Sequence, residues 1–319
     1  MLKYPAPTLV AMALACLLAL TGCAPGMTVP PGESAPANAQ TPAPKIAGTN
    51  TSVKTDGPLQ CAGARFKKSV MLTHVWLSTP PQDIVNLGAA LSKAIAVDLQ
   101  NTGHFHLETT QATQSTGPEP AVDAFKSRGT PYFIRISGHN FGLSGQASMW
   151  SFLGPSLNPR GGTLDIRIVD ALTTQTMAQT TVSAPSVNAG EYDPVIDALG
   201  SDFAASAYGG AMSQLAGEAA NWIDRTLGCK PLIGQVVHVD GSTITINRGI
   251  NDGLRSSDRL LILQRTDRVY QPGQDAYTEH YLLQSLGTAE VARLGEYTTR
   301  IRYGGRQIVQ VGDIVQSGN

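Results

Sequence analysis

The sequence predicts an α+β protein in which a mixed sheet with packed helices is followed by a small all-β barrel. Two observations carry this prediction. Across residues 61–229, β-rich apolar runs alternate with stretches whose apolar residues recur at the helical period. Across residues 230–319, short strands and turn residues follow one another without a helical pattern, which is typical of a small barrel. These two ranges are the expected folded domains.

The amino-terminal segment has the features of a bacterial export signal. Lys3 precedes an apolar run from Leu9 to Leu20, which is too short to span a bilayer because a spanning helix needs about 20 residues. The run leads into Leu20-Thr21-Gly22-Cys23, which resembles the lipobox of bacterial lipoproteins. The resemblance implies that residues 1–22 are a removed signal peptide and that Cys23 becomes the lipidated first residue. An uncleaved membrane anchor with a chance cysteine is the alternative.

The residues after Cys23 bear on location. Ala24 occupies the position where lipoproteins retained in the inner membrane often carry Asp, so the resemblance implies attachment to the periplasmic face of the outer membrane. The acyl chains would supply this anchor, at about 0.8 kcal/mol per buried methylene. Residues 23–60 are dense in Pro, Ala, Thr, Gly and Ser without apolar periodicity, and we expect a disordered or polyproline-like tether.

The chain contains four cysteines, and the expected compartment decides their use. In the lipoprotein interpretation Cys16 leaves with the signal and Cys23 carries the lipid, which leaves Cys61 and Cys229. An exported chain with two remaining thiols is expected to pair them. This disulfide would join the entry of the first folded domain to its exit.

The first folded domain is expected to hold five strands, two main helices and one short helix. In chain order the expected elements are a strand at 69–77, a helix from a cap at Asp83 to about 100, a strand at 104–108, a short helix near 121–128, a strand at 132–140, a hairpin of 163–170 with 177–184, and a helix at 202–227. Glycine costs a helix about 1 kcal/mol relative to alanine. Gly209, Gly210 and Gly217 in the last helix therefore indicate close approach of its backbone to a sheet or a neighbouring subunit.

His104 and His106 are the only pair of residues that suggests a metal. Their spacing in a strand would place both imidazoles on one face. A metal site needs a third and a fourth ligand, and no other residue has suitable spacing. We therefore expect neither a metal nor a cofactor.

The segment 141–161 interrupts two expected strands with glycines around an aromatic centre. An insert of this length inside a compact domain is more often functional than a short turn. We expect Trp150, Phe152 and Leu153 to contact a neighbouring subunit or another envelope protein, because exposed aromatic residues often anchor interfaces. A loop that folds back over its own sheet and a membrane hairpin are the alternatives.

In the barrel region the expected strands are 233–239, 243–247, 259–263, 286–294, 298–303 and 307–315, with a polar loop before the fourth. The stretches Ile246-Asn-Arg-Gly-Ile-Asn-Asp-Gly-Leu254 and Gln310-Val-Gly-Asp-Ile-Val315 resemble the carboxy-terminal domain of the flagellar assembly protein T family. That resemblance implies an SH3-like barrel. The amino-terminal domain of that family is absent here, and the lipobox and tether stand in its place.

The first folded domain carries a second resemblance. Leu99-Gln-Asn-Thr-Gly-His-Phe-His-Leu107 and Leu164-Asp-Ile-Arg-Ile-Val-Asp170 resemble the amino-terminal domain of TolB and its relatives. These relatives include the curli secretion lipoprotein CsgG, the lipoprotein activators of penicillin-binding proteins and the middle domain of flagellar assembly protein T. The resemblance implies a TolB-like and CsgG-like mixed sheet, and it leaves a ring of identical subunits as an expectation.

Composition and missing motifs exclude several functions. The formal net charge is -1 and no basic run is longer than Lys67-Lys68, so no counterion-release term favours nucleic acid. Phosphate loops, dinucleotide fingerprints, zinc-protease motifs and nucleophile elbows are missing from the sequence, so we expect no enzyme. We expect a scaffold whose partners are flagellar basal-body or other envelope proteins. A tethered activator of a peptidoglycan synthase and a curli-type channel subunit are the alternatives.

Overall fold

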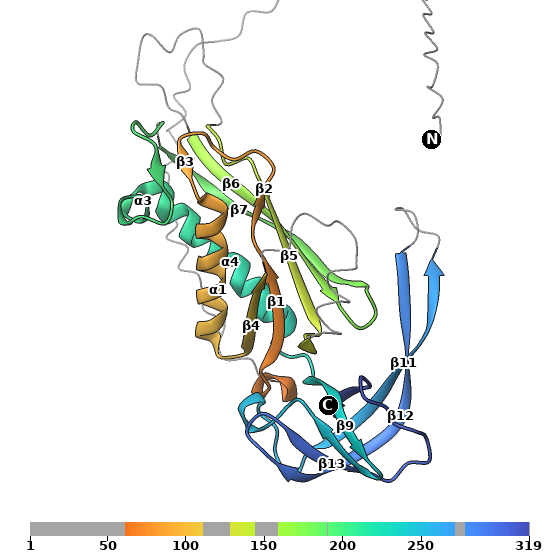
Figure 1. Cartoon of the computed structure of the whole chain (residues 1–319). Helices are drawn as coiled ribbons and strands as arrows, with labels where there is room; N and C mark the ends of the chain where they lie inside the picture. The colour runs from red at the N-terminus through yellow and green to blue at the C-terminus, as the bar shows by residue number, and fades with distance from the viewer. Residues whose placement is uncertain (1–60, 111–127, 144–158, 190, 272–277, 319) are drawn as a thin grey trace, which may run out of the picture. The chain divides into compact units, whose positions relative to one another are not determined.

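The computed structural model describes residues 61–110, 128–143, 159–189, 191–271 and 278–318, all of which belong to one compact unit, Asp56–Asn319 (Figure 1). It contains a mixed sheet with helices packed on it, followed by a closed barrel of six strands. The α+β class, with a mixed sheet before a small all-β barrel, is confirmed.

The mixed sheet has the strand order β4-β1-β5-β6-β7. Its strands are β1 (Lys68–Thr73), β4 (Phe105–Thr110), β5 (Tyr132–His139), β6 (Pro159–Asp170) and β7 (Thr176–Asn188). The inner strand β1 runs parallel to both β4 and β5, whereas β6 is antiparallel to both β5 and β7. Inner position explains the apolar character of β1, because both of its faces are covered.

The expected strand 69–77 is interrupted. A second short strand, β2 (Trp76–Leu77), pairs in parallel with β5 after a break. At the break the amide of Val75 donates to Ser92 Oγ, 2.7 Å away, and Ser92 belongs to the helix α1 (Leu87–Thr102). The Ser92 side chain therefore accepts the hydrogen bond that a neighbouring strand would otherwise accept.

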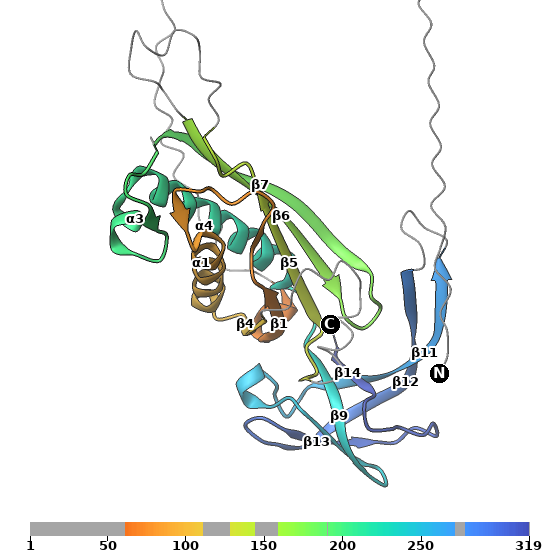
Figure 2. The same ribbon diagram turned by 45° about the horizontal axis from the view of Figure 1, so that its top comes forward.

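Helices α1 and α4 (Ala207–Leu227) pack side by side on one face of the sheet (Figures 1 and 2). The apolar stripe of α1 is buried as its period predicts, and the helix ends at Gly103, whose φ is +74°. The expectation that Asp83 caps this helix is wrong. Asn86 occupies the cap position, and Asp83 forms an ion pair with Arg160 at 2.6 Å.

The expected helix 202–227 is two helices, α3 (Ser201–Ala205) and α4. They are separated at Ser206, whose Oγ accepts a hydrogen bond from the Gly209 amide at 3.0 Å and so caps α4. A Cβ on Gly209 would overlap the carbonyl of Phe203, whereas a Cβ on Gly210 would meet nothing within 4 Å. The backbone is therefore closely approached at Gly209, but its neighbour is the preceding helix and not a sheet, and a Cβ on Gly217 would meet only the Asp98 side chain, at 3.7 Å.

Strand β6 begins at Pro159, earlier than the expected residue 163. Proline is tolerated as the first residue of a strand, where no ladder donor is needed. A Cβ on Gly162 would overlap the ring of Phe141, which is fully buried. Glycine within the strand therefore makes room for an aromatic core residue. Two short strands, β3 (Ile84–Val85) and β8 (Ile196–Asp197), form a separate parallel pair.

The barrel closes in the order β10-β13-β12-β11-β14-β9, with antiparallel pairing throughout. Its strands are β9 (Ile233–Asp240), β10 (Thr243–Ile246), β11 (Arg259–Gln271), β12 (Thr278–Leu294), β13 (Thr299–Tyr303) and β14 (Ile314–Ser317). A 3-10 helix, η3 (Ile250–Asp252), precedes β11. Alternate residues such as Ile244, Ile246 and Ile301 point inward and form the barrel core.

Two expectations for the barrel are wrong. Within the polar loop expected before residue 286, residues 264–271 and 278–285 instead continue β11 and β12, which extend from the barrel as a two-stranded ribbon (Figure 1). The ribbon contacts the turn between β6 and β7 of the sheet, because the amide of Tyr281 donates to the carbonyl of Thr173 at 3.3 Å. The last expected strand begins only at Ile314, because Gly312 has a φ of +98° and Asp313 Oδ2 accepts from the Gln310 amide.

Gly209 and Gly210 form a matched pair for a stability test. We expect Gly209→Ala to lower the free energy of unfolding by roughly 1–3 kcal/mol, because the new methyl group must displace backbone. Gly210→Ala should raise it by up to about 1 kcal/mol through helix propensity. Urea unfolding of the two variants measures both changes, and equal effects would show that the break at Ser206 is misplaced.

Candidate functional site

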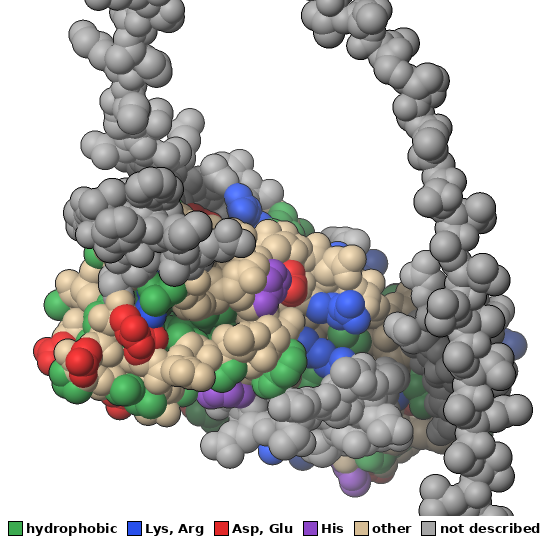
Figure 3. Space-filling view, turned by 90° about the horizontal axis from the view of Figure 1, so that it is seen from above, with side chains coloured by type: hydrophobic (Ala, Val, Ile, Leu, Met, Phe, Trp, Pro, Cys, Tyr) green, Lys and Arg blue, Asp and Glu red, His purple; other side chains and the backbone are tan. Residues whose placement is uncertain are grey.

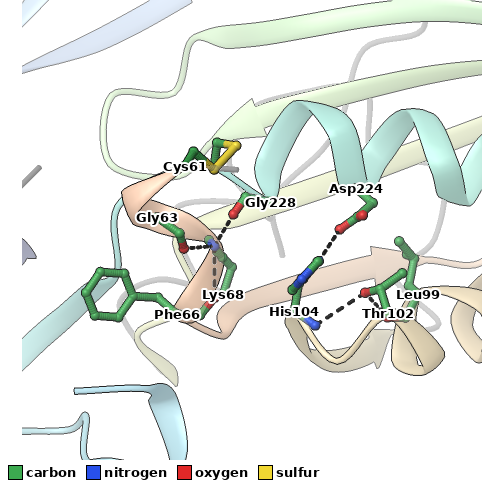
Figure 4. A network of polar contacts seen from close by, with 10 residues as sticks. Cys61, Gly63, Phe66, Lys68, Leu99, Thr102, His104, Asp224 and Gly228 are labelled. Carbon is green, nitrogen blue, oxygen red and sulfur yellow. Dashed lines mark hydrogen bonds and ion pairs between the residues drawn. A yellow bond between two sulfur atoms is a disulfide. The ribbon is translucent and has the colours of Figure 1, made fainter. Parts of the chain in front are cut away.

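The described chain begins at a disulfide between Cys61 and Cys229 (Figure 4). The sulfur atoms are 2.02 Å apart and the Cα atoms 5.7 Å apart. Cys61 precedes the 3-10 helix η1 (Ala62–Arg65), and Cys229 closely follows α4. The bond therefore joins the entry of the sheet region to the chain that leads into the barrel. The expected pairing is confirmed.

Lys68, the first residue of β1, lies close to this disulfide, and only 1% of its surface is exposed. Its Nζ donates to the carbonyl oxygens of Gly63 at 2.6 Å and Phe66 at 2.8 Å, and also to that of Gly228 (Figure 4). An ammonium group has three protons, and each has an acceptor here. Backbone carbonyls from both sides of the disulfide therefore accept all three protons of this buried cation.

The pKa of Lys68 is governed by its burial. Burial lowers the pKa of Lys68 to about 8, and the nearby negative charge of Asp224 opposes this shift. Asp224 is also 2.8 Å from Nδ1 of His104, so the last turns of α4 are tied to the start of β4 (Figure 4). The contacts of Lys68 and Asp224 therefore hold α4, β1 and β4 together.

The same segment reaches into the barrel. Phe66 is buried within the barrel core, and the amide of Lys67 donates to the carbonyl of Asp252 at 3.1 Å. Arg65 forms an ion pair with Asp258 at 2.6 Å. A Cβ on Gly253, whose φ is +89°, would overlap the Arg65 carbonyl, so this turn requires glycine.

Two further arginines connect barrel and sheet. The buried Arg248 donates from Nη2 to the carbonyl of Gly129 at 2.9 Å, and burial lowers its pKa. Arg265 of β11 donates to the carbonyl of Ala171 at 3.0 Å and stacks on Tyr281, with 4.6 Å from its Cζ to the ring centre. We call the disulfide, Lys68 and these barrel contacts the junction. The junction is a structural site that fixes the position of the barrel relative to the sheet.

The other residues singled out from the sequence lie outside the described part of the chain. They are the lipidation site Cys23 and the interface candidates Trp150, Phe152 and Leu153. Described residues lie on both sides of the segment that contains the last three, at 141–143 and from 159 onward.

Both flanks of that segment are fixed to α4. The hydroxyl of Tyr208 lies 3.1 Å from the carbonyl oxygen of Phe141 and 2.9 Å from that of Gly161. Beside it, the guanidinium of Arg160 is 1% exposed and bonds Asp83, while its Nε and Nη1 have no hydrogen-bond partner among the described residues. The rings of Tyr192 and Tyr208 lie 5.5 and 5.4 Å from this cation.

A group of arginines on the barrel was not found from the sequence. Arg259, Arg293, Arg300 and Arg302 are exposed on β11, β12 and β13, and we call them the arginine face. Strand register places Arg293 opposite Arg300, and Glu290 opposite both Arg259 and Arg302. None of the four arginines has an ion pair within 4.0 Å in the part of the chain that the structure describes. Only the Arg300-Ile301-Arg302 alternation could have signalled them.

The two strand histidines bind separate carboxylates. His104 contacts Asp224, and His106 Nε2 is 3.4 Å from Asp252 Oδ1. No group of three or more His, Cys, Asp and Glu residues suited to a metal occurs within the described ranges. Across the same ranges, no helix combines the length and the hydropathy needed to cross a bilayer.

No protein-family model matches the chain, and no curated protein matches it. Similar solved structures include the PelC dodecamer from Paraburkholderia phytofirmans, with 11% identity and a TM-score of 0.33 over 51% of this chain and 89% of that one. Lipoprotein GNA1162 from Neisseria meningitidis has 13% identity and a TM-score of 0.30 over 50% and 99%. The LpoB C-terminal domain from Escherichia coli has 14% identity and a TM-score of 0.28 over 40% and 90%. We draw no functional argument from likeness at this level, and the resemblance to flagellar assembly protein T stays a prediction.

The Lys68→Met variant tests the junction. It keeps the length of the side chain but leaves three carbonyls without a donor, so we expect the free energy of unfolding at neutral pH to fall by roughly 2–4 kcal/mol. In the wild type the folded-state pKa of Lys68 lies near 8, below its ordinary value of 10.5. The unfolded chain therefore binds more protons between these pH values, and stability should rise with pH across that window.

This rise should be missing from Lys68→Met. Urea unfolding of both proteins at pH values between 8 and 10.5 measures the difference. Parallel pH profiles of the two proteins would contradict a lowered pKa at this site.

Proposed function

We propose that this protein is a noncatalytic scaffold of an envelope machine, held at the periplasmic face of the outer membrane by a lipid on Cys23. The junction is the observation that supports the proposal most. Cys61, where the expected tether meets the folded part, is bonded to the residue that leads into the barrel. A force applied through the tether would therefore reach the sheet and the barrel together, at the Cys61–Cys229 bond.

A scaffold must keep its binding surfaces in a constant arrangement. Here the barrel and the sheet share buried contacts through Phe66 and Arg248, rather than a flexible connection. Interfaces within a chain that are polar and small usually permit domain motion, whereas a shared core resists it. This rigidity favours a protein that presents two surfaces at once.

Flagellar basal-body ring assembly is the most specific placement. It rests on the order of the two domains and on the motifs within 246–254 and 310–315, which resemble flagellar assembly protein T. The second candidate is a tethered activator of a peptidoglycan synthase, which the long 23–60 segment favours. A curli-type channel subunit is distinguished by oligomeric rings in membrane extracts.

Cys23→Ser tests the anchor. Serine cannot accept the lipid through a thioether, so we expect the variant to lose outer-membrane fractionation or to accumulate with its signal attached. Membrane fractionation and mass measurement of the amino-terminal peptide report both outcomes. Unchanged processing and fractionation would refute the lipoprotein assignment, and normal basal bodies in cells that lack the chain would refute the flagellar placement.

Trp150→Ser combined with Phe152→Ser tests the proposed contact surface of the 141–161 segment. We expect impaired assembly with an unchanged melting temperature, because interface aromatics contribute to binding and not to the core. Thermal unfolding and co-purification with envelope proteins are the measurements. A marked loss of stability would show that these rings pack in the core of their own chain.

A further inference from the structure

The face of the sheet opposite α1 and α4 carries polar side chains around an exposed tryptophan. Strand alternation decides which residues lie there, because successive side chains of a strand point to opposite faces. On the helix-packed face, a Cβ on Gly138 would meet the side chains of Leu77 and Leu164. Trp76 precedes Leu77 in β2 and therefore points to the opposite face, where 47% of it is exposed. We call this face, across β2, β5, β6 and β7, the open face.

Strand register brings two arginines together on the open face. Trp76 is opposite Ser137 of β5, and the residue of β5 two positions earlier on the same face is Arg135. Arg135 is opposite Arg167 of β6, which in turn is opposite the exposed Gln179 of β7. Rows of side chains on one face of a sheet are about 7 Å apart along the strand. Trp76 and the arginine pair therefore occupy neighbouring rows.

The arginine pair gives this part of the open face a positive charge. Arg167 is exposed, and none of the ion pairs among the described residues includes it. Burial lowers the pKa of Arg135, and the like charge of Arg167 lowers it further. In the next row, Asp165 is 3.3 Å from His139 Nδ1 and accepts from Thr181 Oγ1 at 2.7 Å. Figure 3 shows a surface of this kind, with a histidine beside an acidic side chain and basic side chains close by. An anionic group bound between the two arginines would relieve their repulsion.

The residue types around the arginine pair favour a carbohydrate as the ligand. Besides Trp76, the side chains that share these two rows are Ser137, Asp165, Gln179 and Thr181. None of them is aliphatic, whereas the core of a protein interface and a lipid surface both require apolar contact area. A sugar ring stacks its C–H groups on an exposed indole, and its hydroxyl groups bond to hydroxyl, amide, carboxylate and guanidinium groups. The two rows supply each of these groups.

We propose that the open face binds a glycan that carries carboxylate groups, with a sugar ring stacked on Trp76 and a carboxylate between Arg135 and Arg167. Charge complementarity selects an acidic glycan over a neutral one, because a guanidinium donates to a carboxylate through charge-assisted hydrogen bonds. The two contacts lie in neighbouring rows, so one extended chain of sugars can make both. This binding function goes beyond the proposed scaffold function and depends neither on the lipid anchor nor on the flagellar placement.

Titration calorimetry of the full chain, with tetragalacturonic acid as the probe, tests this inference. We expect the wild type to bind the probe and the affinity to fall as salt is added. Trp76→Ala and Arg167→Gln should each weaken binding about tenfold or more, because one removes the stacking surface and the other a charged donor. The matched controls are Tyr297→Ala, at an exposed aromatic residue of the barrel, and Lys93→Gln, at an exposed cation of α1. Both controls should bind the probe as the wild type does.

Two further probes separate a glycan site from general attraction of anions. Butanetetracarboxylic acid has as many carboxylates as the first probe but no sugar ring, and chitotetraose has as many rings but no carboxylate, so each should bind about tenfold more weakly or less. Thermal unfolding shows whether each variant is folded, and Trp76→Phe, which keeps an aromatic ring, should retain most of the binding. In NMR spectra of the nitrogen-labelled chain, the indole signal that Trp76→Phe removes should shift when tetragalacturonic acid is added.

Several results would overturn the inference. They are a wild-type chain that does not bind tetragalacturonic acid, equal affinity for butanetetracarboxylic acid or chitotetraose, unchanged affinity in a folded Trp76→Ala or Arg167→Gln variant, and an indole signal of Trp76 that does not move. If the chain still fractionates with the outer membrane through Cys23, only this inference fails and the scaffold proposal stands.

Discussion

The buried ammonium of Lys68 is the constraint on which the rest of the structure depends. A buried cation is costly unless every proton has an acceptor, and its three acceptors come from both ends of the sheet region. The end of α4 must therefore lie against the start of β1, and the disulfide between Cys61 and Cys229 enforces the same proximity covalently. Because β9 starts a few residues after Cys229, this requirement also fixes where the barrel begins.

The position of the barrel follows from that start. Phe66 inserts into the barrel core, while Ile233, Leu263 and Ile314 of the barrel pack against the apolar cluster of the sheet. Each of the two apolar clusters thus contains residues from both the sheet region and the barrel, and Arg248 adds a buried hydrogen bond to the Gly129 carbonyl. Removal of the barrel would expose apolar surface on the sheet, so neither part is an independent module in this chain.

The sequence predicted an element wherever a local pattern or the expected compartment was enough to decide it. The helical period predicted α1, Gly103 predicted its end, and export predicted the pairing of Cys61 with Cys229. Apart from this disulfide, where only two thiols remained to be paired, prediction failed where a distant residue decides. Asp83 has the sequence context of a cap but binds Arg160, which is 77 residues away. The arginine face was missed for the same reason, because barrel register, and not sequence spacing, places Arg293 opposite Arg300.

The arginines of this chain fall into two classes, and the difference bears on function. Arg160 and Arg248 are buried, and each bonds a group that the fold itself positions. The arginine face has no such role, because the barrel closes through its backbone ladder and its apolar core, neither of which needs these side chains. Only Arg293 and Arg300 are like charges opposite one another on facing strands, which reduces stability, whereas Glu290 lies opposite both Arg259 and Arg302. The buried arginines therefore serve the fold, whereas the exposed ones are available to other molecules.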